Sequence, residues 1–221
     1  MEAIEVKPSS ELAYLVGVMQ GDGCLYSYKD RTRKDSTRTI LMLGAKDIEM
    51  VQKARDIFVA LFKREVKICK KSTGIFDFHT SVKTLLTQFE ELDIEFKDPP
   101  KPPFWVKHDI KLFGPYLAGL IDADGSISIK RPKYPQCRVR IISGHSQSEL
   151  EKSIERILGC HASIYKSTTY VKVWDKWTSA FDLDFVLSPK IIPTFSEYIL
   201  PYIQIPRKRD KVIKYLTQTS N

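Results

Sequence analysis

The sequence predicts an α+β protein made of two pseudo-symmetric halves, each with the element order αββαββα around an antiparallel sheet. Three observations favour this fold class: a nine-residue block that occurs twice, a proline-rich segment between the two copies, and the same succession of hydrophobic periods after each copy. Together they indicate that one structural unit is repeated within a single chain.

The repeated block gives the size of the unit. Residues 15–23 are LVGVMQGDG and residues 117–125 are LAGLIDADG, which places Asp22 and Asp124 102 residues apart. Two later helical patterns keep roughly the same offset. One repeat is therefore about half of the chain.

A proline-rich segment separates the two copies. Four prolines fall within positions 99–103, and such a stretch can hold neither a helix nor a central strand. We therefore predict an N-terminal domain at residues 1–98, a linker at residues 99–110 and a C-terminal domain at residues 111–221.

Each half begins with a helix that passes directly into a strand. Apolar residues at helical spacing lead to Gly23 and to Gly125, and alternating strands follow at residues 24–28 and 126–130. In the second of these strands the isoleucines face one side, and the serines and the lysine face the other. Each sheet is therefore expected to have an apolar back and a polar, basic front.

The remaining elements follow from shorter patterns. We predict further strands at residues 39–43, 65–69, 75–79, 138–142, 162–165, 170–174 and 181–185. We predict further helices at residues 47–62, 82–92, 148–158 and 191–199. This succession completes two units of the same order.

Composition and charge narrow the class of protein. The 221 residues include 35 Lys plus Arg against 27 Asp plus Glu, a net charge of +8 with a pI near 9.2, which favours a polyanionic partner. With 43% hydrophobic residues the chain can bury a sizeable core, which excludes a disordered tail or a low-complexity scaffold. No apolar run approaches the roughly 18–20 residues of a membrane-spanning helix, and the acidic N-terminus is unlike a secretory or transit peptide. We expect a soluble, intracellular protein, cytoplasmic in a prokaryote.

The cysteines point to no metal centre. Cys24, Cys69, Cys137 and Cys160 stand far apart and form no C-x-x-C pair. This spacing argues against a structural zinc site and against a dense disulfide framework. We expect buried thiols.

Asp22 and Asp124 occupy an unusual position for a structural residue. Each stands in the last turn of its predicted helix, immediately before a glycine. The C-terminal end of a helix carries partial negative charge, so a carboxylate there is disfavoured by about 0.3–1 kcal/mol. A bound cation would reverse this sign, and carboxylate and carbonyl oxygens suit Mg²⁺. The pair predicts a metal site, and Asp-Gly turns at a domain interface are the alternative.

Small residues on the same helices give a reason for the two aspartates to meet. Gly17 and Gly119 lie in mid-helix, where glycine costs about 1 kcal/mol relative to alanine, and Gly21 and Ala123 keep the same face small. Two such helices packed about a pseudo-twofold axis would place the two carboxylates side by side. That arrangement suits metal-assisted hydrolysis of two phosphodiester bonds.

These motifs resemble those of a known family. Residues 117–125 match the LAGLIDADG block letter for letter, and the first copy matches it at Leu15, Gly17, Asp22 and Gly23. The chain is therefore similar to the two-motif, monomeric LAGLIDADG homing endonucleases, and the similarity extends to the order of elements after both blocks. The resemblance implies two LAGLIDADG domains whose antiparallel sheets form a saddle in the major groove of DNA.

The resemblance also implies a metal centre. It assigns two or three divalent ions, Mg²⁺, to the domain interface, bound by the carboxylates of Asp22 and Asp124 and by the backbone carbonyls of Gly21 and Ala123. Asp122, a glutamine in the first copy, is expected to cap or line the interface and not to bind metal.

Members similar to this chain carry basic residues near the metal. Lys46, after the second strand of the first half, is the candidate active-site lysine, and the corresponding place in the second half is His145-Ser146, which departs from a lysine. Lys208 is the candidate for a catalytic lysine that faces phosphate. A solvated surface lysine is the alternative for Lys46, and a charge cluster at a helix start is the alternative for Lys208.

Basic and aromatic side chains fill corresponding hairpins of the two halves, where a two-stranded ribbon can reach base edges. The candidate DNA-binding residues are Tyr26, Tyr28, Arg31, Arg33, Arg38, Lys70, Lys71, Ser126, Ser128, Lys130, Arg131, Lys133, Arg138, Arg140, Lys166 and Lys172. Arginine suits guanine, serine suits mixed roles, and lysines near the ends suit phosphates. For any one of them a solvated surface is the alternative, so the prediction rests on the set.

The resemblance implies a site-specific endonuclease that cuts one phosphodiester on each strand of a long duplex DNA target with Mg²⁺, leaves 3′ overhangs and promotes intron mobility. Because the halves differ in sequence, the target should be asymmetric. The alternative is an intron RNA maturase of the same fold, a splicing cofactor with or without DNA cleavage, in which case intron RNA is a further partner.

Overall fold

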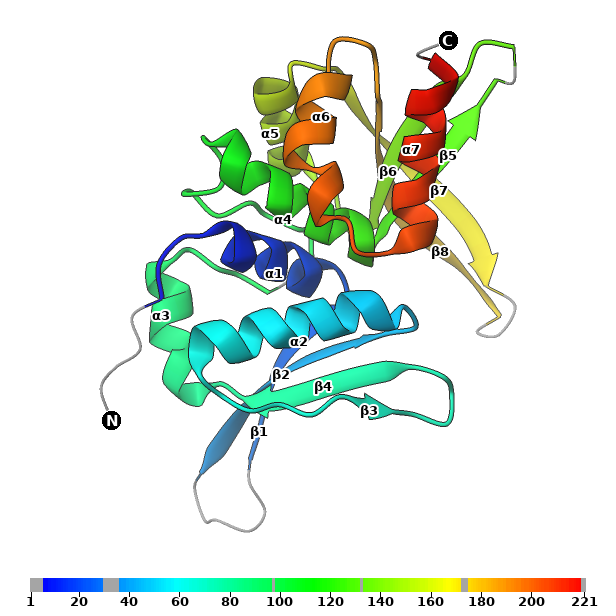
Figure 1. Ribbon diagram of the computed structural model, residues 1–221. Helices are drawn as coiled ribbons and strands as arrows, with labels where there is room; N and C mark the ends of the chain where they lie inside the picture. Colours follow the sequence, from blue (N-terminus) through cyan, green and yellow to red (C-terminus); the bar gives the residue numbers. More distant parts are fainter. Residues whose placement is uncertain (1–5, 30–35, 97, 132, 172–174, 220–221) are drawn as a thin grey trace.

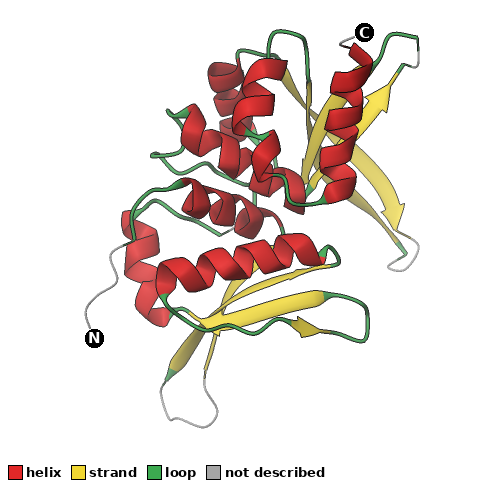
Figure 2. Ribbon diagram, viewed as in Figure 1, coloured by secondary structure: helices red, strands yellow, loops and turns green. Residues whose placement is uncertain are grey.

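The computed structural model describes residues 6–29, 36–96, 98–131, 133–171 and 175–219 (Figure 1). The described chain forms two four-stranded antiparallel sheets with flanking helices, and the element order of the first half recurs in the second. The predicted α+β fold class of two pseudo-symmetric units is confirmed. Figure 2 shows the helices gathered against one side of each sheet.

The two halves have matching elements. The first half contains α1 (Ser10–Gly21), β1 (Gly23–Lys29), β2 (Thr37–Ala45), α2 (Ile48–Phe62), β3 (Cys69–Lys70), β4 (Phe76–Ser81), the 3₁₀ helix η1 (Lys83–Leu85) and α3 (Leu86–Glu91). The second half contains α4 (Ile110–Ala123), β5 (Gly125–Lys130), β6 (Gln136–Ser143), α5 (Ser148–Leu158), β7 (Ala162–Val171), β8 (Lys176–Val186), α6 (Ile192–Tyr198), the 3₁₀ helix η3 (Leu200–Tyr202) and α7 (Pro206–Thr219). The strand orders β1-β2-β4-β3 and β5-β6-β8-β7 are equivalent.

The strand register separates the two faces of each sheet. Leu25 of β1 opposes Leu41 of β2, Ile127 of β5 opposes Val139 of β6, and these residues pack toward the helices. Because strand side chains alternate, the neighbouring residues face away from the helices. We call this second side the open face. It carries Cys24, Tyr26 and Tyr28 in β1 and Ser126, Ser128 and Lys130 in β5.

Three strand predictions were wrong in extent. The strand predicted at residues 65–69 is reduced to Cys69–Lys70, because α2 ends at the left-handed residue Lys63 and irregular chain follows. The strands predicted at residues 162–165 and 170–174 form one strand, Ala162–Val171, and residues 172–174 lie outside the described residues. The break expected between residues 165 and 170 is therefore absent, because this part of the chain is continuous strand in the β7–β8 hairpin.

The C-terminal helix α7 was not predicted as an element, although a charge cluster at a helix start was the alternative for Lys208.

The cysteine prediction was wrong for two residues: Cys24 and Cys69 are exposed, Cys137 is buried and Cys160 is half-buried. Alternation explains Cys24, since its neighbour Leu25 takes the helix-facing position in β1.

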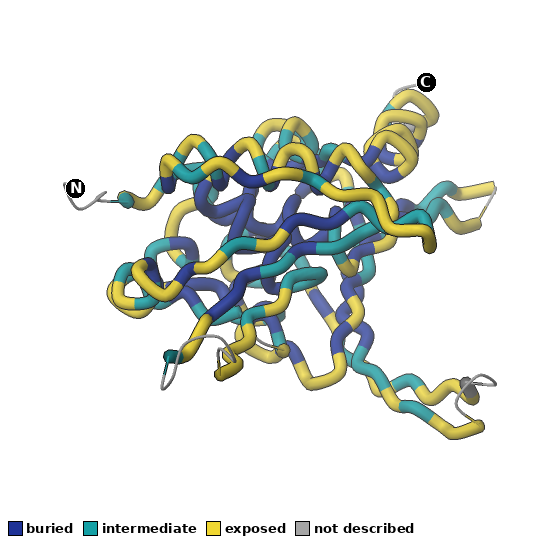
Figure 3. Tube along the Cα trace, turned by 90° about the horizontal axis from the view of Figure 1, so that it is seen from below, coloured by how far each residue is buried: buried dark blue, intermediate teal, exposed yellow. Residues whose placement is uncertain are grey.

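The core is continuous across the two halves, and its centre is the pair of helices α1 and α4. Residues 12–20 of α1 are all buried, as are residues 113–122 of α4. Figure 3 shows the buried residues in the interior, where helices and sheets meet, while the ends of the hairpins are mainly exposed. No helix in the part of the chain that the structure describes is long and apolar enough to cross a membrane.

Candidate active site

Close packing of α1 against α4 places the two motif ends together (Figure 1). A methyl group added to Gly17 would lie 2.1 Å from the carbonyl oxygen of Tyr116, and one added to Gly119 would lie 2.3 Å from the carbonyl oxygen of Tyr14. These separations are far below van der Waals contact, so only glycine fits at the two crossing points. The glycines that are costly within a helix are thus explained by the approach of two backbones.

Asp22 and Asp124 are the C-cap residues of these helices. The N–H of Asp22 donates to the carbonyl of Val18, and the N–H of Asp124 donates to the carbonyl of Leu120, each at 3.0 Å. A methyl group on Gly21 would lie 3.3 Å from Oδ2 of Asp124, so this carboxylate lies against the end of the opposite helix. The structure therefore brings the two predicted aspartates to one place, with Gly21 beside them.

The pKa values of both carboxylates are raised, so their anionic forms are less favourable than that of an ordinary aspartate. Loss of solvation raises the pKa of Asp22, and the Asp47 carboxylate raises it further, against the opposing effect of Lys208. Loss of solvation, then repulsion from Asp22 and Asp98, raises the pKa of Asp124 to about 6, again with Lys208 opposing. Negative charge is concentrated at the negative ends of two helices, and a cation would relieve it.

The donor set at this place fits a hard divalent cation. The candidate ligands are the carboxylates of Asp22 and Asp124 and the backbone carbonyls of Gly21 and Ala123, all of them oxygen. No group of three His, Cys, Asp or Glu side chains able to hold a metal occurs among the described residues. Hard divalent cations prefer oxygen ligands, and one such ion, Mg²⁺, is commonly held by one or two carboxylates, with water and substrate phosphate completing its shell.

The raised pKa of Asp124 predicts a pH dependence of stability. Because the folded-state pKa of about 6 exceeds the ordinary value of 3.8, the folded protein binds the proton more tightly. The stability from this proton is complete below about pH 4 and is lost as pH rises through about 6. We therefore expect Asp124→Asn to raise the unfolding temperature relative to wild type at pH 7.5 and to lose that advantage at pH 4.

This dependence is measured by thermal unfolding in EDTA, with the difference between wild type and variant followed from pH 4 to pH 8. A difference that does not vary with pH would contradict the assignment.

Two tyrosines cross the helix interface to the residues two positions before the aspartates. Tyr14 Oη donates to Asp122 Oδ2 at 2.9 Å, and Tyr116 Oη donates to Gln20 Oε1 at 2.6 Å. All four side chains are buried. The two bonds are equivalent under the pseudo-twofold axis, although one acceptor is an acid and the other an amide.

Asp122 and Gln20 each form hydrogen bonds with the backbone of a more C-terminal segment of the chain. Asp122 accepts the backbone N–H groups of Gln204 at 2.7 Å and Ile205 at 3.2 Å. Gln20 Nε2 donates to the carbonyl of Glu95 at 2.8 Å and to that of Lys101 at 2.9 Å. Asp122 therefore lines the interface between the two motif helices.

Lys208 does not lie where the sequence predicted. Its ammonium donates to the carbonyls of Ile121 at 2.7 Å, Asp122 at 2.6 Å and Ala123 at 3.4 Å, and the residue is buried. Burial lowers its pKa to about 8. Lys208 thus closes the C-terminal end of α4 from inside the protein and does not face outward to phosphate, because the free carbonyls of the last helical turn hold it.

Lys208→Met should reduce the free energy of unfolding by about 1–3 kcal/mol, because it keeps the apolar stem but leaves buried carbonyls without a donor. The measurement is urea unfolding at pH 7.5. Arg209→Met, at the next and exposed position, is the control and should stay within about 0.5 kcal/mol of wild type. Equal stabilities for the two variants would show that the cap contributes nothing.

Lys46 lies exposed between the end of β2 and the start of α2. The next residue, Asp47, accepts two hydrogen bonds from Arg207, at 3.2 Å from Nε and at 2.6 Å from Nη2. Arg207, which the sequence did not single out, thus ties the start of α7 to the start of α2. A role for Lys46 at the active site stays a prediction.

Asp98 is a neighbour of Asp124 that the sequence did not identify. Its carboxylate accepts from Ser143 Oγ and lies 2.7 Å from Nδ1 of His145. The segment after the first half therefore contacts the second half close to the carboxylate pair. One of its contacts there is His145, which corresponds to Lys46 of the first half. No local pattern in the sequence marks Asp98, because its partners are more than forty residues away.

The open face of the first sheet combines aromatic and basic side chains. Tyr26 and Tyr28 are exposed with ring centroids 6.2 Å apart, and Arg38 opposes Tyr28 across the strand pair. Lys71 pairs with the buried Asp77 at 3.0 Å. By contrast Lys70 opposes Phe76, over whose ring it stands at 5.3 Å, and so lies on the helix-facing side. Lys70 therefore lies away from the open face, and its role in DNA binding stays a prediction.

The open face of the second sheet holds an ionic network. Ser126 opposes Arg140 and Ser128 opposes Arg138 across β5 and β6. Asp184 Oδ2 accepts from Arg138 Nη1 at 2.8 Å, and Asp184 Oδ1 accepts from Arg140 Nε at 3.2 Å. Arg138 and Arg140 are thus on the predicted face, but each is held by an acid that the sequence analysis did not single out.

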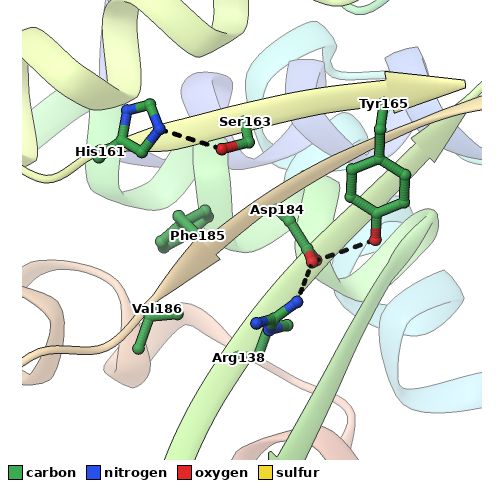
Figure 4. Close-up of a pocket in the computed structure, with 7 residues that line it drawn as sticks. All are labelled: Arg138, His161, Ser163, Tyr165, Asp184, Phe185 and Val186. Atoms are coloured by element: carbon green, nitrogen blue, oxygen red, sulfur yellow. Dashed lines mark hydrogen bonds and ion pairs between the residues drawn. The ribbon is translucent and has the colours of Figure 1, made fainter.

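Further contacts join this network. Tyr165 Oη donates to Asp184 Oδ2 at 3.1 Å (Figure 4), and Asp182 Oδ1 lies 3.7 Å from Arg140 Nη1. Asp182 and Asp184 are buried. Beside the network is a hollow of about 180 Å³. It is lined by Arg138, His161, Ser163, Tyr165, Asp184, Phe185 and Val186.

The other predicted DNA-binding residues are distributed differently. Lys130, Arg131 and Lys133 are exposed where β5 ends. Lys166 opposes Phe181 and alternates with Tyr165, so it lies on the side opposite the open face, and its role in DNA binding stays a prediction. Arg31, Arg33 and Lys172 lie outside the described residues.

Comparisons with known proteins agree with this architecture. I-DmoI, solved in complex with DNA and Mn, matches over 87% of this chain and 97% of its own, with a TM-score of 0.59 and 18% identity. The LAGLIDADG homing endonuclease I-LtrWI, bound to target DNA, matches over 97% of this chain and 92% of its own, with a TM-score of 0.61 and 15% identity. A variant of I-SmaMI matches over 100% of this chain and 93% of its own, with a TM-score of 0.58 and 15% identity. No family model and no curated protein matches the chain. The fold is that of the LAGLIDADG homing endonucleases.

Proposed function

We propose that this chain, which has the fold of the LAGLIDADG homing endonucleases, is a site-specific endonuclease of double-stranded DNA. With Mg²⁺ it hydrolyses one phosphodiester on each strand of a long asymmetric target, leaves 3′ overhangs and promotes intron mobility. It acts as a monomer, because a single chain already contains both motif helices.

One observation carries this proposal. Two aspartates from equivalent positions meet at the ends of two helices, where their anionic forms are disfavoured and where the available donors are oxygen atoms. A purely structural interface gains nothing from this concentration of negative charge. A divalent cation held by Asp22 and Asp124 would relieve it.

The residues of the chain would share the work of hydrolysis. Asp22 and Asp124 would hold the ions, with the carbonyls of Gly21 and Ala123 beside them. When bound, the metal lowers the pKa of an attacking water and stabilises the leaving oxygen. Lys208 holds the end of α4 in place, so that the Asp124 carboxylate keeps its position relative to Asp22.

The open faces of the two sheets would contact the DNA. They occupy equivalent positions in the two halves, and the strands β1 and β5 begin directly after Asp22 and Asp124. The net charge of +8 supports binding of a polyanion. The solved proteins of the same fold include members bound to target DNA.

The proposal is tested with duplex DNA that carries the host locus without its intron. Mg²⁺ should yield a pair of discrete fragments, and EDTA should yield none. Specific binding without any cutting in Mg²⁺ would contradict the nuclease, and absence of both binding and cutting would contradict DNA recognition as well.

A further inference from the structure

The two open faces differ at equivalent positions. Gly23 opposes Leu43 and Gly125 opposes Ile141, which aligns Ile40 and Met42 of β2 with Arg138 and Arg140 of β6. The first half therefore places two apolar side chains where the second half places two guanidinium groups.

The same alignment relates the acids of the neighbouring strands. Leu43 opposes Phe78 and Ile141 opposes Leu183, so Asp77 corresponds to Asp182 and His79 corresponds to Asp184. At the central position of the open face, the second half pairs Arg140 with Asp184, where the first half has Met42 opposite His79.

The charge of this network cancels. Two arginines and two aspartates contribute no net charge to a surface that would face DNA. Attraction to phosphate depends on net positive charge, so the network adds little to binding that ignores sequence. Its geometry, in contrast, is tightly fixed, because Asp184 accepts hydrogen bonds from three side chains at once.

The guanidinium of Arg138 keeps donor capacity beyond the network. Its Nη1 donates to Asp184. Its Nη2 has no hydrogen-bond partner among the described residues and belongs to a side chain that is 31% exposed. In Figure 4 Arg138, Tyr165 and Ser163 border the hollow, and His161 holds Ser163 at 3.1 Å. The polar groups around the hollow are therefore already positioned by other side chains.

We propose that Asp184 is a positioning residue that holds Arg138 and Arg140 in the geometry that recognises guanine in the major groove. Tyr165 supports Asp184 in this role. Arginine donates to N7 and O6 of guanine in a two-pronged arrangement, and a guanidinium fixed before binding loses less freedom when it does so. The inference rests on the proposed function, and it makes the second half of the protein the more selective for G·C pairs.

The test is a binding selection from a library of duplex DNA with a randomised 24-base-pair segment, carried out in EDTA so that bound DNA stays intact. Wild type should enrich a site with at least one strongly preferred G·C pair on one side. Asp184→Asn should lose about tenfold or more of that preference. It should bind unselected DNA at least as tightly, because it removes a negative charge.

Asp77→Asn is the matched control. Asp77 occupies the open face of the first sheet, has the same 7% side-chain exposure as Asp184, and pairs with Lys71 and with no arginine in the described structure. This variant makes the same charge change and should keep the guanine preference. Tyr165→Phe leaves the charge unchanged and should weaken the preference less than Asp184→Asn.

The outcomes separate the two proposals. A wild type that enriches no sequence overturns DNA recognition and the positioning role together. A wild type that enriches a site, with Asp184→Asn and Tyr165→Phe both retaining its guanine preference, overturns the positioning role alone. Circular dichroism checks that each variant is folded at the selection temperature. If Asp184→Asn is unfolded, the guanine preference of Tyr165→Phe is the test of the positioning role.

Discussion

Asp22→Asn and Asp124→Asn are each expected to reduce DNA cleavage by about 10³-fold or more while DNA binding is retained. A metal ion supplies several kcal/mol of charge stabilisation to the reaction, and each 1.4 kcal/mol is a factor of ten in rate. Asparagine has nearly the same shape as aspartate, so the helix ends keep their packing. Removal of a negative charge beside the DNA phosphates should leave affinity equal or higher.

The measurement is single-turnover cleavage in Mg²⁺, with affinity followed by fluorescence anisotropy in EDTA. Asp56→Asn is the control, because Asp56 is an aspartate on α2 whose side chain is 51% exposed and pairs with Arg55. It should cut at the wild-type rate. Normal cutting by Asp22→Asn or Asp124→Asn would refute the metal assignment.

Gly17→Ala and Gly119→Ala are expected to cost the largest share of stability, about 3 kcal/mol or more each. The new methyl group would stand 2.1 Å or 2.3 Å from a carbonyl oxygen of the opposite backbone, and neither backbone can move without separating the helices. Overpacking of a core ordinarily costs about 1–3 kcal/mol, and a clash with backbone has less room to relax than one with a flexible side chain.

Urea unfolding measures this loss, and Gly44→Ala is the control. At Gly44 the nearest atoms to an added methyl group are 3.5 Å and 3.6 Å away, which is ordinary contact, so its stability should stay within about 0.5 kcal/mol of wild type. If the two helical variants were as stable as Gly44→Ala, the helices would be less closely packed than described.

The fold and the paired aspartates could be predicted because their signals are local and repeated. Two copies of one block, each with small residues at helical spacing and an acid before glycine, specify two similar helices and the faces by which they meet. The strand faces near Tyr26 and Ser126 also followed from simple alternation. Nothing in this set depends on which distant segments come together.

The surroundings of the site could not be predicted because they depend on long-range contacts. Arg207 meets Asp47 across 160 residues, and Lys208 meets the end of α4 across 87. No periodicity carries such information. Lys166 fell between two predicted strands, whereas it lies within the single strand β7.

One missed signal was present in the sequence. Residues 76–78 are Phe-Asp-Phe, and residues 181–185 are Phe-Asp-Leu-Asp-Phe. Acids that alternate with apolar residues in a buried strand must lie on the opposite face from the core. That alternation places Asp182 and Asp184 on the open face, which is also the face of Arg138 and Arg140, while the pairing of β6 with β8 sets which of them meet.

The burial of α1 has a consequence for synthesis on the ribosome. Residues 12–20 are buried on every side, and α4 supplies one of the covering surfaces. At about 5–20 residues per second, the nascent chain needs roughly 5–20 s to extend from the end of α1 to the end of α4. During that interval the first half exposes an apolar helix that it cannot cover itself. The first half made alone should therefore aggregate or bind chaperones, and should become soluble when the second half is co-expressed with it.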